Sequence, residues 1–488
     1  MLRKLLLLIL VVLVVGALGA PYLFGAKAEE IHRQFAQQLT AQGSAGLKSS
    51  DFSKGLFKSS ARDVIEVCSA AAGCRELVIS SVIHHGPIAI TGIIDGVAPM
   101  RPVQAVMIST ARLDGMFEGA DITPALPNMT ITTVAELDGN SVATLDMPAS
   151  NHSIKGKSET YKLALGGISG YFTGRAGEQK VKGKMDFPSL KLEGDKGLSL
   201  TLGKLSARVD GEGSAAGFIG IIEENIDSIT LTTVPQDPRP LTIQDIEIAV
   251  NGSRSSDGLS QSQLKAGIRA ISAGGREYGP ATLEGEALRF NQAAVTRMQK
   301  EVEALEKKPP QEALPAIMAA YQKGLQEVLK SRPEINLKSL NLKTPDGDLI
   351  ASLKLVGTPP GGELNLAAWP AMLQAELGLQ IPAVTLWNIL DAQMQQVAHT
   401  AAAQSGQPPV LPTQDQIGAK VTELVEHNVF VPKLDANAYT LQVAMLEGRL
   451  LVNGQENQAF TNLTQLFMTP KQLVPPPGFD MQQPPPTQ

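Results

Sequence analysis

The chain has 488 residues, with 42 basic and 48 acidic side chains. At about 150 residues per domain, this length predicts two or three domains, although an extended β architecture can run longer as one unit. The charge balance is mildly acidic and no dense cluster of lysine and arginine occurs, which excludes nucleic acid as a partner.

The N-terminus carries an uncharged and almost wholly apolar run, residues 5–26, directly behind Arg3 and Lys4. About 22 helical residues with a rise of 1.5 Å each cover the roughly 30 Å of a bilayer's hydrocarbon core, and the basic flank stays in the cytoplasm. The alternative is a cleaved signal peptide, whose apolar stretch is usually only about 7 to 15 residues long. We therefore expect a single transmembrane helix in the lipid bilayer, with residues 27–488 on the far side.

The segment after this anchor, residues 27–54, places Ile31, Phe35 and Leu39 four positions apart. This spacing puts the three side chains on one face of a helix. We expect an amphipathic helix followed by a linker.

Two cysteines occur in the chain, Cys68 and Cys74, six positions apart. In an oxidising compartment, such a pair forms a disulfide that closes a small loop. A loop this short is worth only about 2 to 3 kcal/mol by chain entropy, so the bond would pin a local turn. The alternative is a redox pair, which usually has the closer C-x-x-C spacing.

Residues 55–290 show short apolar alternations that are separated by Gly, Asp and Asn. Ile246, Ile248 and Val250, for example, alternate with polar residues. A period of two with turn residues between the runs is typical of antiparallel strands with one buried face. We expect a β-rich region here.

Helical spacing returns at residues 291–330, where two apolar stripes are separated by Lys307-Lys308-Pro309-Pro310, and it predicts a helical hairpin. Strands resume with a hairpin around Thr344-Pro345-Asp346-Gly347, and a phase shift between Leu337 and Leu340 indicates a bulge. Helices are expected at 383–403 and 414–428, before a last hairpin.

The fold class is thus α+β: a transmembrane helix followed by an extended, mostly antiparallel β-rich body with inserted helices. The expected divisions are 1–26 (anchor), 27–54 (helix and linker), 55–290 (β-rich), 291–330 (helical hairpin), 331–470 (mixed strands and helices) and 471–488 (a disordered Pro/Gln-rich tail).

No catalytic or ligand-binding motif is readable along the chain. The six histidines are scattered, no metal-ligand spacing occurs, and neither a nucleophile elbow nor a phosphate-binding loop is present. The nearest approach to a dinucleotide motif, Gly211 to Gly217, has one residue too many and predicts a turn between strands. We therefore expect no catalytic residues, cofactor or metal.

Paired histidines, His84 and His85, precede Gly86-Pro87 at the end of an apolar run that is typical of a strand. Neighbouring strand residues point to opposite faces, so the two rings cannot easily converge on one metal ion. We expect a structural turn here; the alternative is a metal ligand or a general base.

Several segments together resemble one known family. They are the N-terminal anchor, Gly55-Leu56-Phe57-Lys58-Ser59-Ser60-Ala61, Ile83-His84-His85-Gly86-Pro87, Thr344-Pro345-Asp346-Gly347 and Leu450-Leu451-Val452-Asn453-Gly454. In this order they resemble the YdgA-like family of bacterial inner-membrane proteins, which has no assigned function. Leu56 stands where the family usually has tryptophan. The resemblance implies a periplasmic domain tethered to the inner membrane and supplies no catalytic residues.

These observations leave three functions open. The first is a non-enzymatic envelope scaffold or interaction protein, with an envelope protein or a lipid as partner and with homo-oligomers allowed. The second is binding of a lipid or another hydrophobic ligand in a groove of the sheet, which requires an apolar face left uncovered by helices. The third is an envelope hydrolase that gathers carboxylates from distant strands. A soluble exported protein remains an alternative if the N-terminus is cleaved.

Overall fold

The computed structural model describes residues 45–55, 57–69, 73–112, 121–156, 159–175, 180–214, 217–232, 240–306, 310–359, 372–405, 408–446 and 448–456. The expected anchor and the expected C-terminal tail lie outside these residues and stay predictions. Within the described part of the chain, no helix is both long enough and apolar enough to span a membrane.

The described strands pair antiparallel and join one sheet. Those of the N-terminal part are β1 (Ala45–Ser53), β2 (Lys58–Ser69), β3 (Gly73–His85), β4 (Ala105–Arg112), β5 (Asp121–Thr123), β6 (Met129–Ala135), β7 (Asn140–Met147), β8 (Ser150–Lys155), β9 (Thr160–Leu165), β10 (Ile168–Arg175), β11 (Lys180–Phe187), β12 (Leu190–Gly194), β13 (Ser199–Leu202) and β14 (Leu205–Ser214). Those of the C-terminal part are β15 (Gly217–Thr232), β16 (Leu241–Arg254), β17 (Ser260–Ala273), β18 (Arg276–Tyr278), β19 (Ala281–Phe290), β20 (Glu334–Thr344), β21 (Gly347–Gly357), β22 (Leu373–Pro382), β23 (Val431–Lys433), β24 (Ala438–Leu446), β25 (Arg449–Val452) and β26 (Gln455–Glu456).

Four pairs of consecutive strands in the N-terminal part are long strands bent at a two-residue corner. The corners are Pro148-Ala149, Gly166-Gly167, Pro188-Ser189 and Gly203-Lys204. They are hydrogen-bonded to neighbouring strands, since Gly166 N donates to Ser189 O and Gly203 N donates to Ser228 O, each over 2.8 Å. Glycine is required at the Gly203 corner, because a Cβ there would lie 2.7 Å from the Ser228 hydroxyl. The corners fold the sheet over along one line.

The folded sheet encloses the main hydrophobic core. One series of strands, β4-β6-β7-β10-β11-β14, and a second, β5-β8-β9-β12-β13, meet on β15, which pairs with β14 through its first part and with β13 through its last residues. Buried side chains of both series form one cluster with Ile65, Leu77 and Ile79 of β2 and β3. We call β1–β14 the closed part of the sheet.

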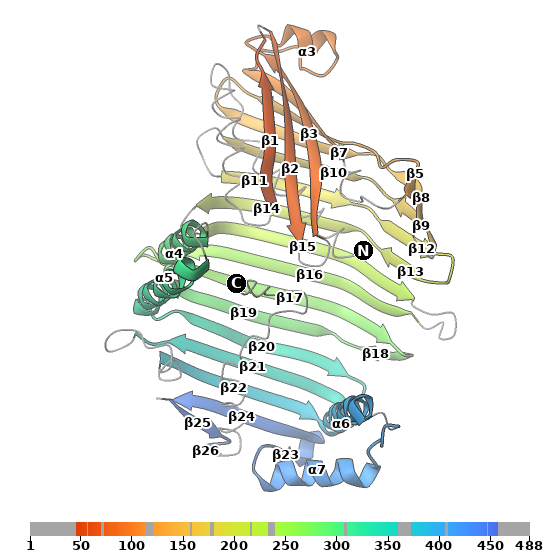
Figure 1. Ribbon diagram of the computed structural model, residues 1–488, viewed down its shortest axis with the longest axis vertical. Helices are drawn as coiled ribbons and strands as arrows, with labels where there is room; N and C mark the ends of the chain where they lie inside the picture. Colours follow the sequence, from red (N-terminus) through yellow and green to blue (C-terminus); the bar gives the residue numbers. More distant parts are fainter. Residues whose placement is uncertain are drawn as a thin grey trace, which may run out of the picture.

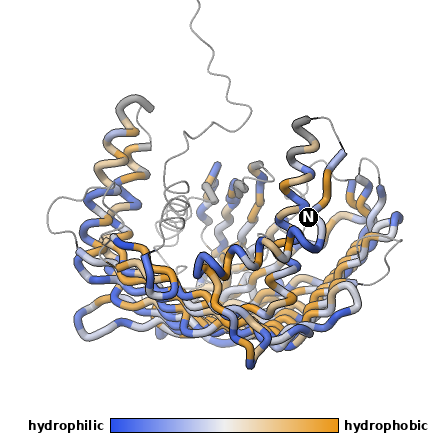
Figure 2. The backbone as a smooth tube through the Cα atoms, turned by 90° about the horizontal axis from the view of Figure 1, so that it is seen from below, coloured by the Kyte–Doolittle hydropathy of each residue, from blue (hydrophilic) through white to orange (hydrophobic). Residues whose placement is uncertain are grey.

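Beyond this core the sheet continues as a single layer, in the order β15-β16-β17-β19-β20-β21-β22-β24-β25-β26, which we call the open part. Figure 1 shows these strands stacked along the long axis, with β1–β3 running across the other strands at one end. Seen along that axis, the backbone forms a trough with helices standing at its rims on the open side (Figure 2).

The helices lie at the margins of this sheet (Figure 1) and are α3 (Ile90–Ile94), α4 (Gln292–Glu306), α5 (Pro310–Lys330), α6 (Ala383–Ser405) and α7 (Gln414–Glu426), with a short 3₁₀ helix at Leu434–Ala436. α7 begins with a capping box, in which the Thr413 hydroxyl and the Gln416 side chain each accept a hydrogen bond from the other residue's backbone N–H. α6 and α7 bury Leu386, Leu390 and Ile417 against the sheet.

The predicted antiparallel β-rich body with inserted helices is confirmed for the described residues. The predicted bulge is also present, because the β20–β21 register shifts between Leu337 and Leu340. Two segments differ from expectation. β1 begins at Ala45, inside the segment predicted as helix and linker, because these residues pair with β2 and Leu47 packs on the core. The turn predicted for 211–217 is shorter, since Gly211 and Gly213 still pair with Gly220 and Phe218.

Candidate functional site

One face of the open part carries rows of residues that are apolar except for Glu224, each residue directly opposite the next on the neighbouring strand. The first row is Val209, Ile222, Val250, Leu264, Gly285, Leu337, Leu353, Leu377, Val443 and Val452. The second is Met185, Ala207, Glu224, Ile248, Ala266, Leu283, Leu340, Ala351, Leu379 and Leu441. Directly opposed side chains share one face of a sheet, so these rows form a single apolar surface.

This apolar surface is the concave face of the trough. Its first members, including Val209 and Met185, belong to or pack on the enclosed core of the closed part. At the other end, Leu349 and Tyr439 of the same face pack under α6, which stands on the open side of the trough (Figures 1 and 2). The concave face is therefore the continuation of the core beyond the strands that enclose it.

Burial changes along the rows at β15. In the closed part the inner side chains are almost inaccessible, as for Met185 at 1% and Phe187 at 2% exposure. In the open part the corresponding residues are half-buried, and Leu264 is 37% and Ile335 47% exposed. A contiguous apolar surface left accessible in this way is typical of an interaction or ligand-binding site.

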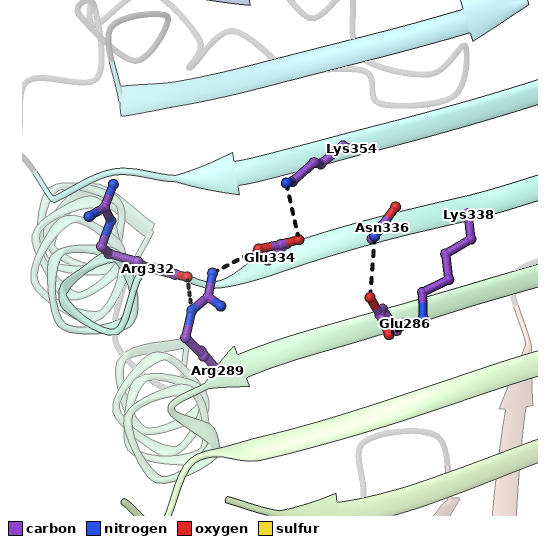
Figure 3. Close-up of polar contacts among 7 residues, drawn as sticks. All are labelled: Glu286, Arg289, Arg332, Glu334, Asn336, Lys338 and Lys354. Carbon is purple, nitrogen blue, oxygen red and sulfur yellow. Dashed lines mark hydrogen bonds and ion pairs between the residues drawn. The ribbon is translucent and has the colours of Figure 1, made fainter.

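The opposite, convex face carries charged side chains that neutralise one another (Figure 3). Arg289 donates to the Glu334 carboxylate over 2.9 Å, and the second oxygen of Glu334 lies 3.7 Å from the Lys354 ammonium. Glu286 pairs with the Lys338 ammonium at 2.6 Å and accepts a hydrogen bond from Asn336 at 3.2 Å. Both carboxylates are thus held by cations in surface ion-pair networks, which is not the arrangement of a free general acid and base.

The molecule also has shallow hollows. One, of about 530 Å³, is lined by residues of β20 to β25, both polar ones such as Asn336 and Lys354 and members of the first apolar row such as Leu337 and Leu353. Another, of about 460 Å³, lies between α6 and α7 and is lined mainly by apolar residues, among them Met394 and Val410.

The paired histidines lie at the end of β3 and point to different partners. His84 is buried, and its Nδ1 lies 2.9 Å from the Thr91 hydroxyl of α3, with the Asp95 carboxylate 3.9 Å from Nε2. His85 Nε2 lies 2.9 Å from the Ser59 hydroxyl. Burial lowers the pKa of both histidines below the usual range. The predicted divergence of the two rings is confirmed, and each ring fastens a different segment to the end of the strand.

The structure also reveals an apolar apex that the sequence reasoning missed. α3 and the loop behind it expose Ile90 at 55%, Ile94 at 78% and Met100 at 90%. The sequence does contain a group of apolar residues directly after Gly86-Pro87, which could have indicated this exposed apex.

The described residues bear on the expectations for a metal site and for a disulfide. No group of three or more His, Cys, Asp or Glu side chains that could hold a metal ion occurs there. The β2–β3 register places Cys68 directly opposite Cys74, and Cys74 takes part in a disulfide. Directly opposed strand residues lie at a Cα separation that a disulfide can bridge. The Cys68–Cys74 bond of the purified protein stays a prediction.

Comparison with known proteins identifies one family profile, described as a bacterial protein of unknown function (DUF945), which matches residues 2–458. Neither the curated proteins nor the solved structures include a match to the chain.

Proposed function

Since the chain belongs to DUF945, a bacterial family of unknown function, we propose that it is a single-pass inner-membrane protein whose periplasmic body binds the apolar chain of a lipid-like ligand. The anchor and the compartment rest on residues 5–26 and on the resemblance to YdgA-like proteins. The binding activity rests on the concave face.

The observation that carries the proposal is the change in burial along the apolar rows. The same rows form a packed core in the closed part and a half-buried surface in the open part. Covering apolar surface is worth about 25 cal/mol per Å², so a ligand that lies along the open rows gains the same stabilisation that β2 and β3 supply in the closed part. An acyl chain has the matching shape, because the rows are continuous across strands and carry almost no polar side chains.

A second candidate, an envelope interaction protein, is favoured by the exposed apex. Ile94 and Met100 project from α3 and its loop at the end of the sheet that is remote from α6 and α7 (Figure 1). An apolar apex of this kind fits docking onto a protein or a bilayer. The two functions are compatible, because the apex and the concave face involve different residues.

Photocrosslinking with the full-length protein in its bacterial membrane tests the binding function. A photoreactive phenylalanine analogue at Leu340, on the concave face, is compared with the same analogue at Asn341, the next residue on the convex face. We expect lipid adducts by mass spectrometry at position 340 and none at 341. Equal labelling at both positions, or none at 340, would contradict the proposal.

A further inference from the structure

One side chain of the concave face differs in kind from all its neighbours in the apolar rows. In the row from Met185 to Leu441, every member is apolar except Glu224 of β15. Glu224 stands directly between Ala207, which is buried, and Ile248. A carboxylate among apolar groups is costly unless a hydrogen-bond donor or a cation compensates it.

The adjacent residue, Glu223, shows the ordinary alternative. Its side chain points to the convex face, is 41% exposed and pairs with Arg208 at 3.4 Å. Among the residues that the structure describes, none forms a hydrogen bond or ion pair with the Glu224 side chain. The two consecutive glutamates of β15 thus lie in different environments. Glu223 forms an ion pair on the exposed convex face, whereas the Glu224 carboxylate lies on the apolar face without a described hydrogen-bond donor or cation.

The position of Glu224 is also significant. β15 is the strand at which the closed part ends, so Glu224 marks the closed end of the accessible apolar surface. Three strand spacings of about 4.8 Å carry the rows about 14 Å from β15 across β16, β17 and β19, close to the roughly 15 Å of hydrocarbon in one bilayer leaflet. An acyl chain whose polar end lies beside Glu224 would therefore cover the rows as far as β19.

We infer that Glu224 recognises the head group of the bound ligand, and that this ligand is an amphiphile with an ammonium group at the end of its apolar chain. The inference rests on the proposed function and adds the chemistry of the head group to it. An ammonium supplies both the hydrogen-bond donors and the positive charge that a carboxylate accepts. The surrounding apolar residues strengthen such a pair, because they exclude water from it.

The test uses the full-length protein held in amphipol and loaded with an apolar fluorescent probe, N-phenyl-1-naphthylamine. Dodecylammonium, dodecanol and laurate compete for the probe; they share a twelve-carbon chain and differ in head group. We expect dodecylammonium to displace the probe at a concentration about tenfold lower than laurate, as a charge-assisted hydrogen bond provides. E224Q should abolish this preference, and E223Q, its matched control on the convex face, should keep it.

The outcomes separate the two proposals. Equal competition by all three amphiphiles, or a preference that survives in E224Q, overturns the ammonium inference and leaves the proposed function standing. Failure of all three to displace the probe, or failure of the probe to bind, overturns the proposed function as well. E224M guards against a folding defect: its β-sheet circular dichroism should match the wild type while its preference for dodecylammonium is lost.

Discussion

The same leucine-to-alanine substitution should cost more stability in the enclosed core of the closed part than on the apolar face of the open part. Leu77 of the closed part is 1% exposed, whereas Leu264 of the open part is 37% exposed. Replacing Leu77 by Ala removes about three buried carbon groups at roughly 0.8 kcal/mol each and leaves a cavity, for a loss of about 3 to 4 kcal/mol in the free energy of unfolding. For Leu264→Ala only about two-thirds of this transfer energy is lost, and no cavity forms because solvent fills the space. We therefore expect a loss of about 1.5 kcal/mol in the free energy of unfolding.

Urea denaturation of the full-length protein in amphipol, followed by circular dichroism of the β-sheet, measures the difference. The two variants share chemistry and differ only in how completely the site is enclosed, which makes each the control of the other. The Leu264→Ala variant should also bind the naphthylamine probe more weakly, while Leu77→Ala should not. Equal losses of stability, with no effect of Leu264→Ala on probe binding, would refute the distinction between a closed core and an open ligand surface.

Three further predictions concern the anchor, the cysteines and the histidines. Alkaline phosphatase fused after residue 60 should be active, since residues 5–26 are expected to direct the rest of the chain across the membrane; a mature chain in the soluble periplasm that starts near Glu29 would contradict this. Peptides that contain Cys68 and Cys74 should be two hydrogens lighter without reduction, and free thiols at both positions would exclude the disulfide. The protein should lose stability as the pH falls below about 6.5, and a variant with glutamine at both His84 and His85 should lose less.

The sign of this pH effect follows from the lowered pKa of the two histidines. Burial is the largest cause for both rings, and the nearby charge of Lys58 adds to it for His84. The folded state therefore holds fewer protons than the unfolded state once the pH falls below the ordinary histidine pKa. The stabilisation is complete above that pH and is lost as the pH approaches the lower folded pKa. A stability profile that is flat between pH 7 and 5, or equal in the glutamine variant, would contradict the argument.

Period-two patterning was sufficient to predict the antiparallel strands, because a sheet with one apolar face leaves its alternation in the sequence. The phase shift between Leu337 and Leu340 even located a bulge. What the pattern could not provide is which apolar face is covered. Met185 and Leu264 look alike in sequence, since each lies between two polar neighbours, and their burial differs because β2 and β3 fold over one part of the sheet and not the other. β1 was missed for a related reason: between Leu47 and Ser53 only Leu47 and Phe52 are apolar, so the strand is stabilised by pairing with β2 rather than by its own composition.

The continuity of the rows couples ligand binding to the stability of the fold. A chain lying on Ile248, Ala266 and Leu283 contacts side chains whose row continues, past Glu224, to the buried Ala207 and Met185. Ligand at a concentration a hundredfold above its dissociation constant stabilises the folded state by about 2.7 kcal/mol if it does not bind the unfolded chain. Because the bound ligand would also enclose Leu264, the cost of Leu264→Ala should rise toward that of Leu77→Ala when the protein is loaded. In this view the apolar face of the open part becomes a buried core only when a bound ligand covers it.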